Sequence, residues 1–551
     1  MAVGECLRAM LMQGVLLPHW GEWKLDTAGL EKLNLPDNVL DISLHRLREL
    51  SQETLVVLRQ AAVVGARFDA RLLNELHTDE QHAVYHAVAE ASAARLLDTT
   101  GKRDHYVFIH DRVRIALLEQ QAADQIKRTH QNLALALEQM DISIPGHIYA
   151  LAEHYAAGFT DEDPARVYAT NKQAGCRAVI DNDSDRALRY FTTARLFLPR
   201  SGYEVVPEGA ELARWMGEAC VKTKRLKEAR ELFDQALAGI RDPLTRTRIL
   251  VQSSQLAGSR YEFDKARADI KAAFKELGTR MPHTTPFTLA VAFIRWASIP
   301  LLKKLGWFRK PTSKSEKGRL RLLADLLDRT ATLSYYEFNG PGMLHQVLKE
   351  LVIAERLGPS LEMVKGYSAL SAACAVMGLK KAAFSFIRRT QEVSDWLDTP
   401  ILRARTSLTI TFVSAYVGDV RASQAESERL RRYAGTLDPW LLNATHVVRA
   451  FHFLMQGRAT AALQAIGEGR WQLQQMGQSE DSDPEFFHVF DLFEAQSKAL
   501  LGQHSEALAV AEEAVRRTQG LSPRDRYSLC RIYGAVALCL AETGDTNPRL
   551  L

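Results

Sequence analysis

The chain has 551 residues, of which 46% are hydrophobic and 25% charged, and its formal net charge at pH 7 is +4. These values are typical of an ordinary folded chain and exclude large-scale disorder, and the charge is too small to indicate nucleic-acid binding by itself. The length predicts three or four domains, or one extended array.

Cysteine usage and the N-terminus both favour a cytoplasmic location. The six cysteines form no Cys-x-x-Cys motif, which is typical of buried, reduced thiols in a cytosolic protein. They are Cys6, Cys176, Cys220, Cys374, Cys530 and Cys539. Glu5 and Arg8 interrupt the short apolar run at the start of the chain, so no secretion signal is predicted.

Residues 1–140 are predicted to form a small winged-helix-like domain with a helical lead-in. Helices are expected at 39–50, 54–64, 68–76 and 82–97, and again at 112–121 and 122–140 on the way into the next region. Ser51 and Thr54 are competing cap positions for the second helix. The segments 96–102 and 106–109 flank a turn and predict a β-hairpin. Helices followed by a hairpin indicate a winged helix.

The stretch Tyr106–Val113 is the candidate nucleotide-sensing corner of this domain. Two apolar strand positions lead into His110, Asp111 and Arg112, and a helical pattern follows. A His-Asp pair at such a corner can contact a phosphate that another part of the protein binds. The alternative is that His110 and Asp111 only cap the following helix, with the Asp near its positive end.

Residues 141–285 and 321–551 are predicted to be helical repeats. Turn positions recur about every 40 residues, and a small residue follows each turn about five positions later, which indicates a solenoid of helix pairs similar to tetratricopeptide repeats. The turns are Asn182, Arg225, Phe263, Gly340, Gly378, Gly418, Gly457 and Gly502, and the small residues include Ala187, Ala229, Ala266, Ala382, Ala422, Ala461 and Ala507. The interval from Phe263 to Gly340 is twice as long and predicts two units. The fold class is therefore all-α.

Residues 286–320 are predicted to be an apolar and basic insertion within the array. The run 287–302 is almost uniformly apolar, but it is shorter than the ~20 residues that span a bilayer, and Arg295 lies at its centre, so no transmembrane segment is predicted. One reading is a buried helix followed by a solvated basic loop; the other is weak contact with a membrane surface. The candidate membrane-interface residues are Arg295, Lys303, Lys304, Trp307, Arg309 and Lys310.

Other candidate sites carry little chemistry. His82 and His86 lie four residues apart without a third ligand, so no metal site is predicted. The segment 82–97 has Arg95 as its one basic residue, which argues against nucleic-acid binding. Trp396, Trp440 and Trp471 are expected in the core of the repeats.

Three blocks resemble a known family. They are Leu35–Val39 with Arg46 and Leu47, Leu58–Phe68, and Phe108–Val113. They resemble the region after the ATPase core in bacterial STAND-type signalling ATPases, as in multi-domain serine/threonine kinase, ATPase and sensor histidine kinase regulators. The resemblance covers roughly residues 10–545. It implies a winged helix followed by a repeat arm, with His110 facing the nucleotide and Asp111 orienting the turn.

The chain departs from that family in one respect. It contains no Gly-x-x-x-x-Gly-Lys-Ser/Thr segment to cradle phosphates, so ATP hydrolysis by this chain alone is not predicted. No cofactor is expected on it; ATP or ADP with Mg²⁺ would bind only to an upstream core. We therefore expect a regulatory arm that gates a signalling ATPase or kinase and binds a protein or ligand through its repeats. The alternatives are a truncated ATP-hydrolysing enzyme and a winged-helix transcription regulator.

Overall fold

The structure is a computed structural model, and its chain forms two compact units, Met1–Ala219 and Cys220–Leu551. The described residues are 10–11, 15–19, 22–26, 45–77, 81–140, 146–223, 225–260, 262–433, 439–475, 484–518, 533–534 and 537. Residues 45–48 of the predicted helix 39–50 are helical, and residues 39–44 lie outside the described residues.

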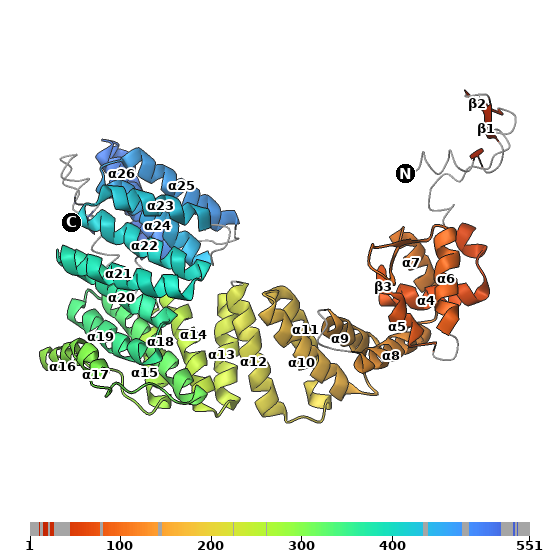
Figure 1. The fold of residues 1–551 in the computed structure, drawn as a ribbon, viewed down its shortest axis with the longest axis horizontal. Coiled ribbons are helices and arrows are strands. Elements are labelled where there is room, and N and C mark those ends of the chain that lie inside the picture. The colour runs from red at the N-terminus through yellow and green to blue at the C-terminus, as the bar shows by residue number, and fades with distance from the viewer. Residues whose placement is uncertain are drawn as a thin grey trace. The chain divides into compact units, whose positions relative to one another are not determined.

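The first unit begins with short strands and helices and continues as helices (Figure 1). Its elements are β1 (Leu16–His19), β2 (Glu22–Leu25), α4 (Gln52–Val64), β3 (Arg67–Asp69), α5 (Ala70–Asn74), α6 (Gln81–Ala93), β4 (Leu97–Thr99), β5 (His105–Phe108), α7 (Asp111–Glu119), α8 (Ala123–Gln139), α9 (His147–Ala157), α10 (Pro164–Ile180), α11 (Ser184–Phe197), the 3₁₀ turn η1 (Leu198–Arg200) and α12 (Val205–Lys222), whose last turn reaches the second unit.

The predicted hairpin is confirmed as β4 and β5, and a third strand joins it. The sheet has the order β3-β5-β4 with both pairs antiparallel, and Tyr106 of β5 lies opposite Phe68 on one side and Thr99 on the other. The expected helix 68–76 is therefore wrong at its start. Phe68 is buried in a strand, and the Asp69 side chain caps the shorter α5 by accepting from the Arg71 amide.

Ser51 caps α4, which resolves the two competing cap positions. Its side-chain oxygen accepts a hydrogen bond from the Thr54 amide at 3.3 Å. Glu90 of α6 accepts from the Ser51 amide at 3.0 Å and from the Ser51 hydroxyl at 2.8 Å, and it also binds the Thr54 hydroxyl. These bonds, with that of Thr54 first, lower the pKa of Glu90 and link α4 to α6.

A pair of histidines, His154 buried and His130 partly buried, joins α8 to α9. The Nδ1 atoms of His130 and His154 lie 2.8 Å apart, so one ring donates and the other accepts. Burial, and then the charge of His130, lowers the pKa of His154 to about 4, and burial also lowers the pKa of His130. The pair is therefore neutral at pH 7.

This pair should make the stability of the first unit depend on pH. The unfolded chain takes up protons near the ordinary histidine value, whereas folded His154 resists protonation until about pH 4, so stability falls as the pH falls below about 6.5. Between pH 7 and pH 5 we expect a loss of about 2 kcal/mol from His154, seen as a lower urea midpoint. His154→Asn should flatten this slope, and His82→Asn, which removes an exposed histidine, should leave it unchanged.

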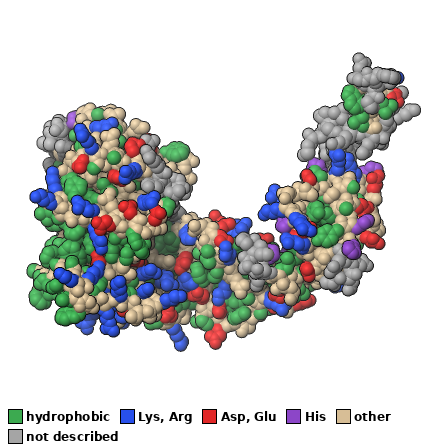
Figure 2. Space-filling view, in the orientation of Figure 1, with side chains coloured by type: hydrophobic (Ala, Val, Ile, Leu, Met, Phe, Trp, Pro, Cys, Tyr) green, Lys and Arg blue, Asp and Glu red, His purple; other side chains and the backbone are tan. Residues whose placement is uncertain are grey.

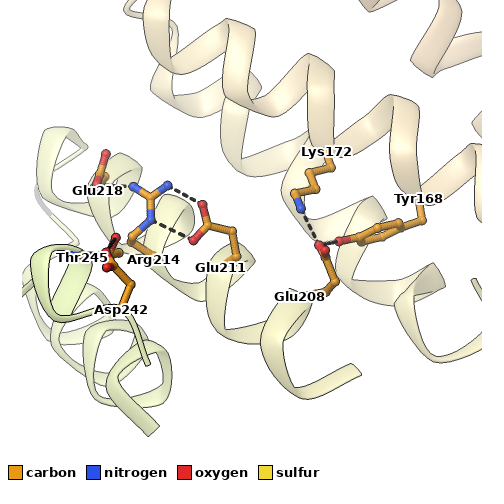
Figure 3. Close-up of polar contacts among 8 residues, drawn as sticks. All are labelled: Tyr168, Lys172, Glu208, Glu211, Arg214, Glu218, Asp242 and Thr245. Atoms are coloured by element: carbon orange, nitrogen blue, oxygen red, sulfur yellow. Dashed lines mark hydrogen bonds and ion pairs between the residues drawn. The ribbon is translucent and has the colours of Figure 1, made fainter. Parts of the chain in front are cut away.

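Helix α12 carries two groups of charged side chains (Figure 3). The group around Arg214 lies within α12, and the group around Glu208 joins α12 to α10. Arg214 binds Glu211 at 2.6 Å and Glu218 at 2.8 Å, and its guanidinium lies 4.0 Å from the centre of the Trp215 ring. Glu208 binds both Tyr168 and Lys172 of α10. Because Arg214 is buried, its two carboxylate partners are what make that burial tolerable.

The second unit consists of helices. They are α13 (Leu226–Gly239), α14 (Pro243–Ser259), α15 (Phe263–Glu276), α16 (Pro286–Ala297), α17 (Ile299–Lys304), α18 (Lys314–Tyr336), α19 (Gly340–Leu357), α20 (Leu361–Val376), α21 (Lys380–Leu397), α22 (Pro400–Val417), α23 (Val420–Tyr433), α24 (Pro439–Met455), α25 (Ala459–Gln475), α26 (Pro484–Leu500) and α27 (His504–Thr518).

These helices pack as antiparallel pairs that stack along the unit (Figure 1). The pairs are α14–α15, α18–α19, α20–α21, α22–α23, α24–α25 and α26–α27. The first helices of successive pairs contact one another, so α14, α18, α20, α22, α24 and α26 form a continuous layer. The predicted all-helical, tetratricopeptide-like solenoid is confirmed.

The turn between the two helices of a pair has the same backbone conformation in several repeats. A residue in the left-handed conformation ends the first helix, and a fully buried small residue lies five positions later, where the two helices approach most closely. The turn residues are Asn182, Gly378, Gly418, Gly457 and Gly502, and the buried ones are Ala187, Ala383, Ser423, Ala462 and Ala507. Three predicted small residues, Ala382, Ala422 and Ala461, were thus one position early.

The insertion α16–α17 lies between two pairs. The interval from Phe263 to Gly340 contains α15, α16, α17 and α18. Helix α15 pairs with α14 and α18 pairs with α19, whereas α16 packs on α19 from outside these pairs, so the insertion takes the place of the second predicted repeat. The run Pro286–Lys304 is long and apolar enough to cross a membrane by length and composition, and only 11% of its most apolar window is buried. The reading of a buried helix is therefore wrong.

Two tryptophans expected in the core also lie at the surface. Trp396 and Trp471 are 69% and 59% exposed. The side chain of Trp440 lies outside the described residues. Of the cysteines, Cys176, Cys220 and Cys374 are free thiols, and Cys220 and Cys374 are buried as expected; burial raises the pKa of Cys220 to about 11. Cys6, Cys530 and Cys539 are outside the described residues.

Candidate functional site

The predicted corner at His110 lies between β5 and α7 in the first unit. His110 has the N-cap position with extended backbone, but its side chain makes no cap hydrogen bond. Asp111 is exposed and accepts from Arg114 Nε at 2.8 Å, and Arg112 is exposed beside it. Arg114 also donates to the carbonyl of Ala62 in α4 at 3.4 Å. Asp111 thus orients Arg114, which contacts α4. Asp111 also lies in the first turn of α7, where a negative charge suits the positive end of the helix dipole, as the capping alternative expects. His110, by contrast, does not cap the helix with its side chain.

A group of polar and charged side chains lines a cavity in the second unit. A cavity of about 430 Å³, here named the polar hollow, is formed by α14, α15, α18, α20 and α22. Its walls are Ser254, Gln255, Gly258, Ser259, Phe263, Ala266, Ile270, Asp328, Arg329, Thr332, Leu333, Tyr336, Lys365 and Arg405. Sequence reasoning expected a binding face here but named none of these side chains as part of it.

Helix periodicity brings the charged groups of the polar hollow together. Asp325, Asp328 and Arg329 lie three and four residues apart on α18, which places them on one side of that helix. Lys365 of α20 contacts Asp328 at 3.1 Å and Asp325 at 3.6 Å. Arg329 donates to the side-chain oxygen of Gln255 in α14 at 3.0 Å. Three repeat pairs are thereby linked through polar contacts.

The carboxylates behind the hollow share one lysine. Burial would raise the pKa of Asp328, but Lys365 and then Arg329 outweigh it and hold that pKa below its usual value. Burial raises the pKa of Asp325 despite Lys365. Glu350 of α19 is almost completely buried, and burial, followed by the charge of Asp328, raises its pKa well above the usual value. The site therefore keeps Asp328 ionised beside a lysine and favours a proton on Glu350.

The remaining wall of the hollow is apolar. Phe263 and Tyr336 stack with their ring centres 5.2 Å apart, and Ile270 and Leu333 extend the same surface. The lining has three basic residues, Arg329, Lys365 and Arg405, and one acidic residue, Asp328, and Lys365 is already paired with Asp328 and with Asp325 behind the lining. An apolar wall with a few placed charges is typical of a site that binds a ligand or a peptide segment. The two arginines of the lining favour an acidic ligand or segment.

The membrane-interface candidates lie together on the inserted helices and the loop after them. Arg295, Lys304, Trp307, Arg309 and Lys310 are exposed. Lys303 differs from the others because its ammonium binds Glu355 of α19, a nearly fully buried carboxylate, and lies 5.3 Å from the Phe308 ring centre. Lys303 therefore fixes the insertion to the repeats.

The stacked helix pairs define a class: this is a helical-repeat protein of the tetratricopeptide-like kind. No protein-family model matches the sequence, and no curated protein matches it. Among solved structures, the chain is similar to a STAND signal-transduction ATPase with a tetratricopeptide repeat sensor from Pyrococcus horikoshii, with 12% identity and a TM-score of 0.42 over 93% of this chain and 67% of that one. It is also similar to yeast Tom70, with 12% identity and a TM-score of 0.37 over 80% of this chain and 98% of that one.

Proposed function

We propose that this chain is a regulatory interaction arm of a signalling ATPase or kinase, and that it receives its signal as an acidic peptide segment bound in the polar hollow. The observation that carries the binding role is the hollow itself, with an apolar wall, three basic residues and one ionised carboxylate. An acidic group would meet the guanidinium of Arg329, while the stacked rings of Phe263 and Tyr336 would cover apolar side chains.

The gating role rests on the first unit. The order helix, strand, helix, helix, strand, strand from α4 to β5 supports a winged helix. We infer that His110, Asp111 and Arg112 face a nucleotide held by a separate ATPase core, as the family resemblance implies. The competing transcription role has less support, because α6, the helix that would enter a DNA groove, contains no Lys or Arg.

Selection of displayed random peptides on the full chain tests the binding role. Acidic peptides should be enriched, and replacing their Asp and Glu by Asn and Gln should weaken binding by ~10-fold or more, because a charge-assisted hydrogen bond contributes about 1.5–3 kcal/mol. Arg329→Ala should cause a similar loss, and Arg388→Ala, which removes an exposed arginine of α21, should not. Equal binding by acidic and neutral peptides would contradict the proposal.

Nucleotide titration tests the gating role separately. The full chain alone should bind neither ATP nor ADP in the presence of Mg²⁺, because it lacks a phosphate-binding loop. Tight binding would favour the alternative, a truncated ATP-hydrolysing enzyme.

A further inference from the structure

Four apolar side chains on one side of the inserted helices are exposed to solvent. Phe287 and Ile294 of α16 are 77% and 64% exposed, and Leu301 of α17 is 59% exposed. With Val291, they lie at intervals of four, three and seven residues, which at about 100° per residue places all four on one side of the helix. This stripe, formed by Phe287, Val291, Ile294 and Leu301, is here named the apolar stripe.

The opposite side of the same helices is where they pack on the repeats. Ala292 and Ile299 are buried, and Trp296 packs against Phe386 of α21 with ring centres 5.7 Å apart. Lys303 lies on this side as well and binds Glu355. The insertion therefore has two apolar sides, and the contacts with α19 and α21 use only one of them.

Basic residues surround the apolar stripe. At about 100° per residue, Arg295 lies on one flank of the stripe and Lys304 on the other. The loop that follows adds exposed Trp307, Arg309 and Lys310. Residues 286–321 contain nine Lys and Arg against Glu316, a net charge of +8, whereas the whole chain carries +4. Glu316 itself binds Arg356 at 3.0 Å. Figure 2 shows hydrophobic and basic side chains gathered at this edge of the second unit, at the lower left.

We propose that α16 and α17 dock this unit on an anionic lipid bilayer, lying in the plane of the membrane with the apolar stripe in the interface. An amphipathic helix with flanking bases and a tryptophan suits the boundary between acyl chains and negative headgroups. A spanning orientation is disfavoured, because it would place Arg295 in the hydrocarbon and would remove Trp296 from its contact with α21. The strong positive charge selects anionic lipid over a neutral apolar partner.

Co-sedimentation of the full chain with vesicles tests this. The chain should bind phosphatidylglycerol-containing vesicles and should not bind pure phosphatidylcholine vesicles. Each base near an anionic surface strengthens binding roughly fivefold, so Lys304→Gln, Arg309→Gln and Lys310→Gln together should weaken binding roughly 100-fold. Ile294→Ser should also weaken it, since it removes an apolar side chain from the stripe.

Matched control variants and a fluorescence measurement distinguish docking on a membrane surface from a spanning helix and from binding of a second copy of the chain. Trp396→Ser and Lys381→Gln change exposed residues of α21 and should leave vesicle binding intact. Fluorescence of Trp307 should shift to the blue on vesicles, and Trp307→Phe should abolish that part of the shift. Equal binding to both vesicle types, resistance to alkaline extraction, or self-association that Ile294→Ser abolishes without any vesicle binding would each overturn the proposal, the last by indicating a second copy as the occupant.

Discussion

Gly469→Ala should destabilise the C-terminal repeats, while Gly467→Ala on the same helix should stabilise them. A Cβ at Gly469 would lie 2.4 Å from Cζ of Phe490 and 3.0 Å from Cβ of His446. Phe490 is fully buried between α25 and its neighbours, so its ring has little room to move. Overpacking of this kind costs about 1–3 kcal/mol.

Gly467 provides the matched control because a Cβ there would meet no atom within 4 Å. Alanine is favoured over glycine in a helix by up to ~1 kcal/mol, so Gly467→Ala should raise the urea midpoint. The double variant Gly469→Ala, Phe490→Leu should recover part of the loss, since the smaller side chain leaves space for the new Cβ. If both glycine variants were equally stable, the close contact between α25 and Phe490 would be wrong.

Lys365→Met should cause a large loss of stability that shrinks as the pH falls. The lysine is 16% exposed and contacts both Asp325 and Asp328, whose side chains are 38% and 29% exposed. Removing the lysine leaves two partly buried carboxylates without compensation, at a cost of about 2 kcal/mol at pH 8 because solvent screens them in part. Loss of the lysine raises the folded pKa of both aspartates. Because a carboxyl whose folded pKa is raised loses stability as the pH rises, the variant should be closest to wild type near pH 5.

Glu350→Gln is the companion experiment. Burial raises the pKa of Glu350 well above its ordinary value, so the wild type loses stability as the pH rises toward that folded value. A glutamine at this position would carry no charge at any pH, so the variant should match or exceed the wild type at pH 8 and should relieve part of the Lys365→Met defect. Lys381→Met, at an exposed position, should leave the urea midpoint unchanged. A loss there equal to that of Lys365→Met would mean that the polar hollow has no special role.

The repeat architecture was predictable because its signals are local. Gly378, Gly418, Gly457 and Gly502 supply left-handed turns that other residues adopt at a cost, so their spacing reveals the pairs. The buried small residue was placed one position early at Ala382 and Ala461. In each case the next residue, Ala383 or Ala462, is also an alanine, and only the three-dimensional packing shows which of the two is buried between the helices.

The polar hollow was not predictable, and the sequence left two readings of the insertion open, for a different reason. Gln255, Arg329 and Lys365 are separated by 74 and 36 residues and meet only when the pairs stack. The one local signal was the group Asp325, Asp328 and Arg329 within a leucine-rich helix. The insertion had the composition of a buried helix, and which side of α16 faces solvent depends on its contact with α19.

The stacking of the second unit also has a mechanical consequence. In the described part of the second unit, the most extensive contacts of each helix pair are with the pairs next to it, so bending of the unit is distributed over the joints between successive pairs. A ligand in the polar hollow would touch α14, α18, α20 and α22 at once and would restrain three consecutive joints. Amide hydrogen exchange in these helices should then slow on binding, while exchange in α26 and α27 stays the same. Binding at one site would thus reduce the motion of several successive helix pairs.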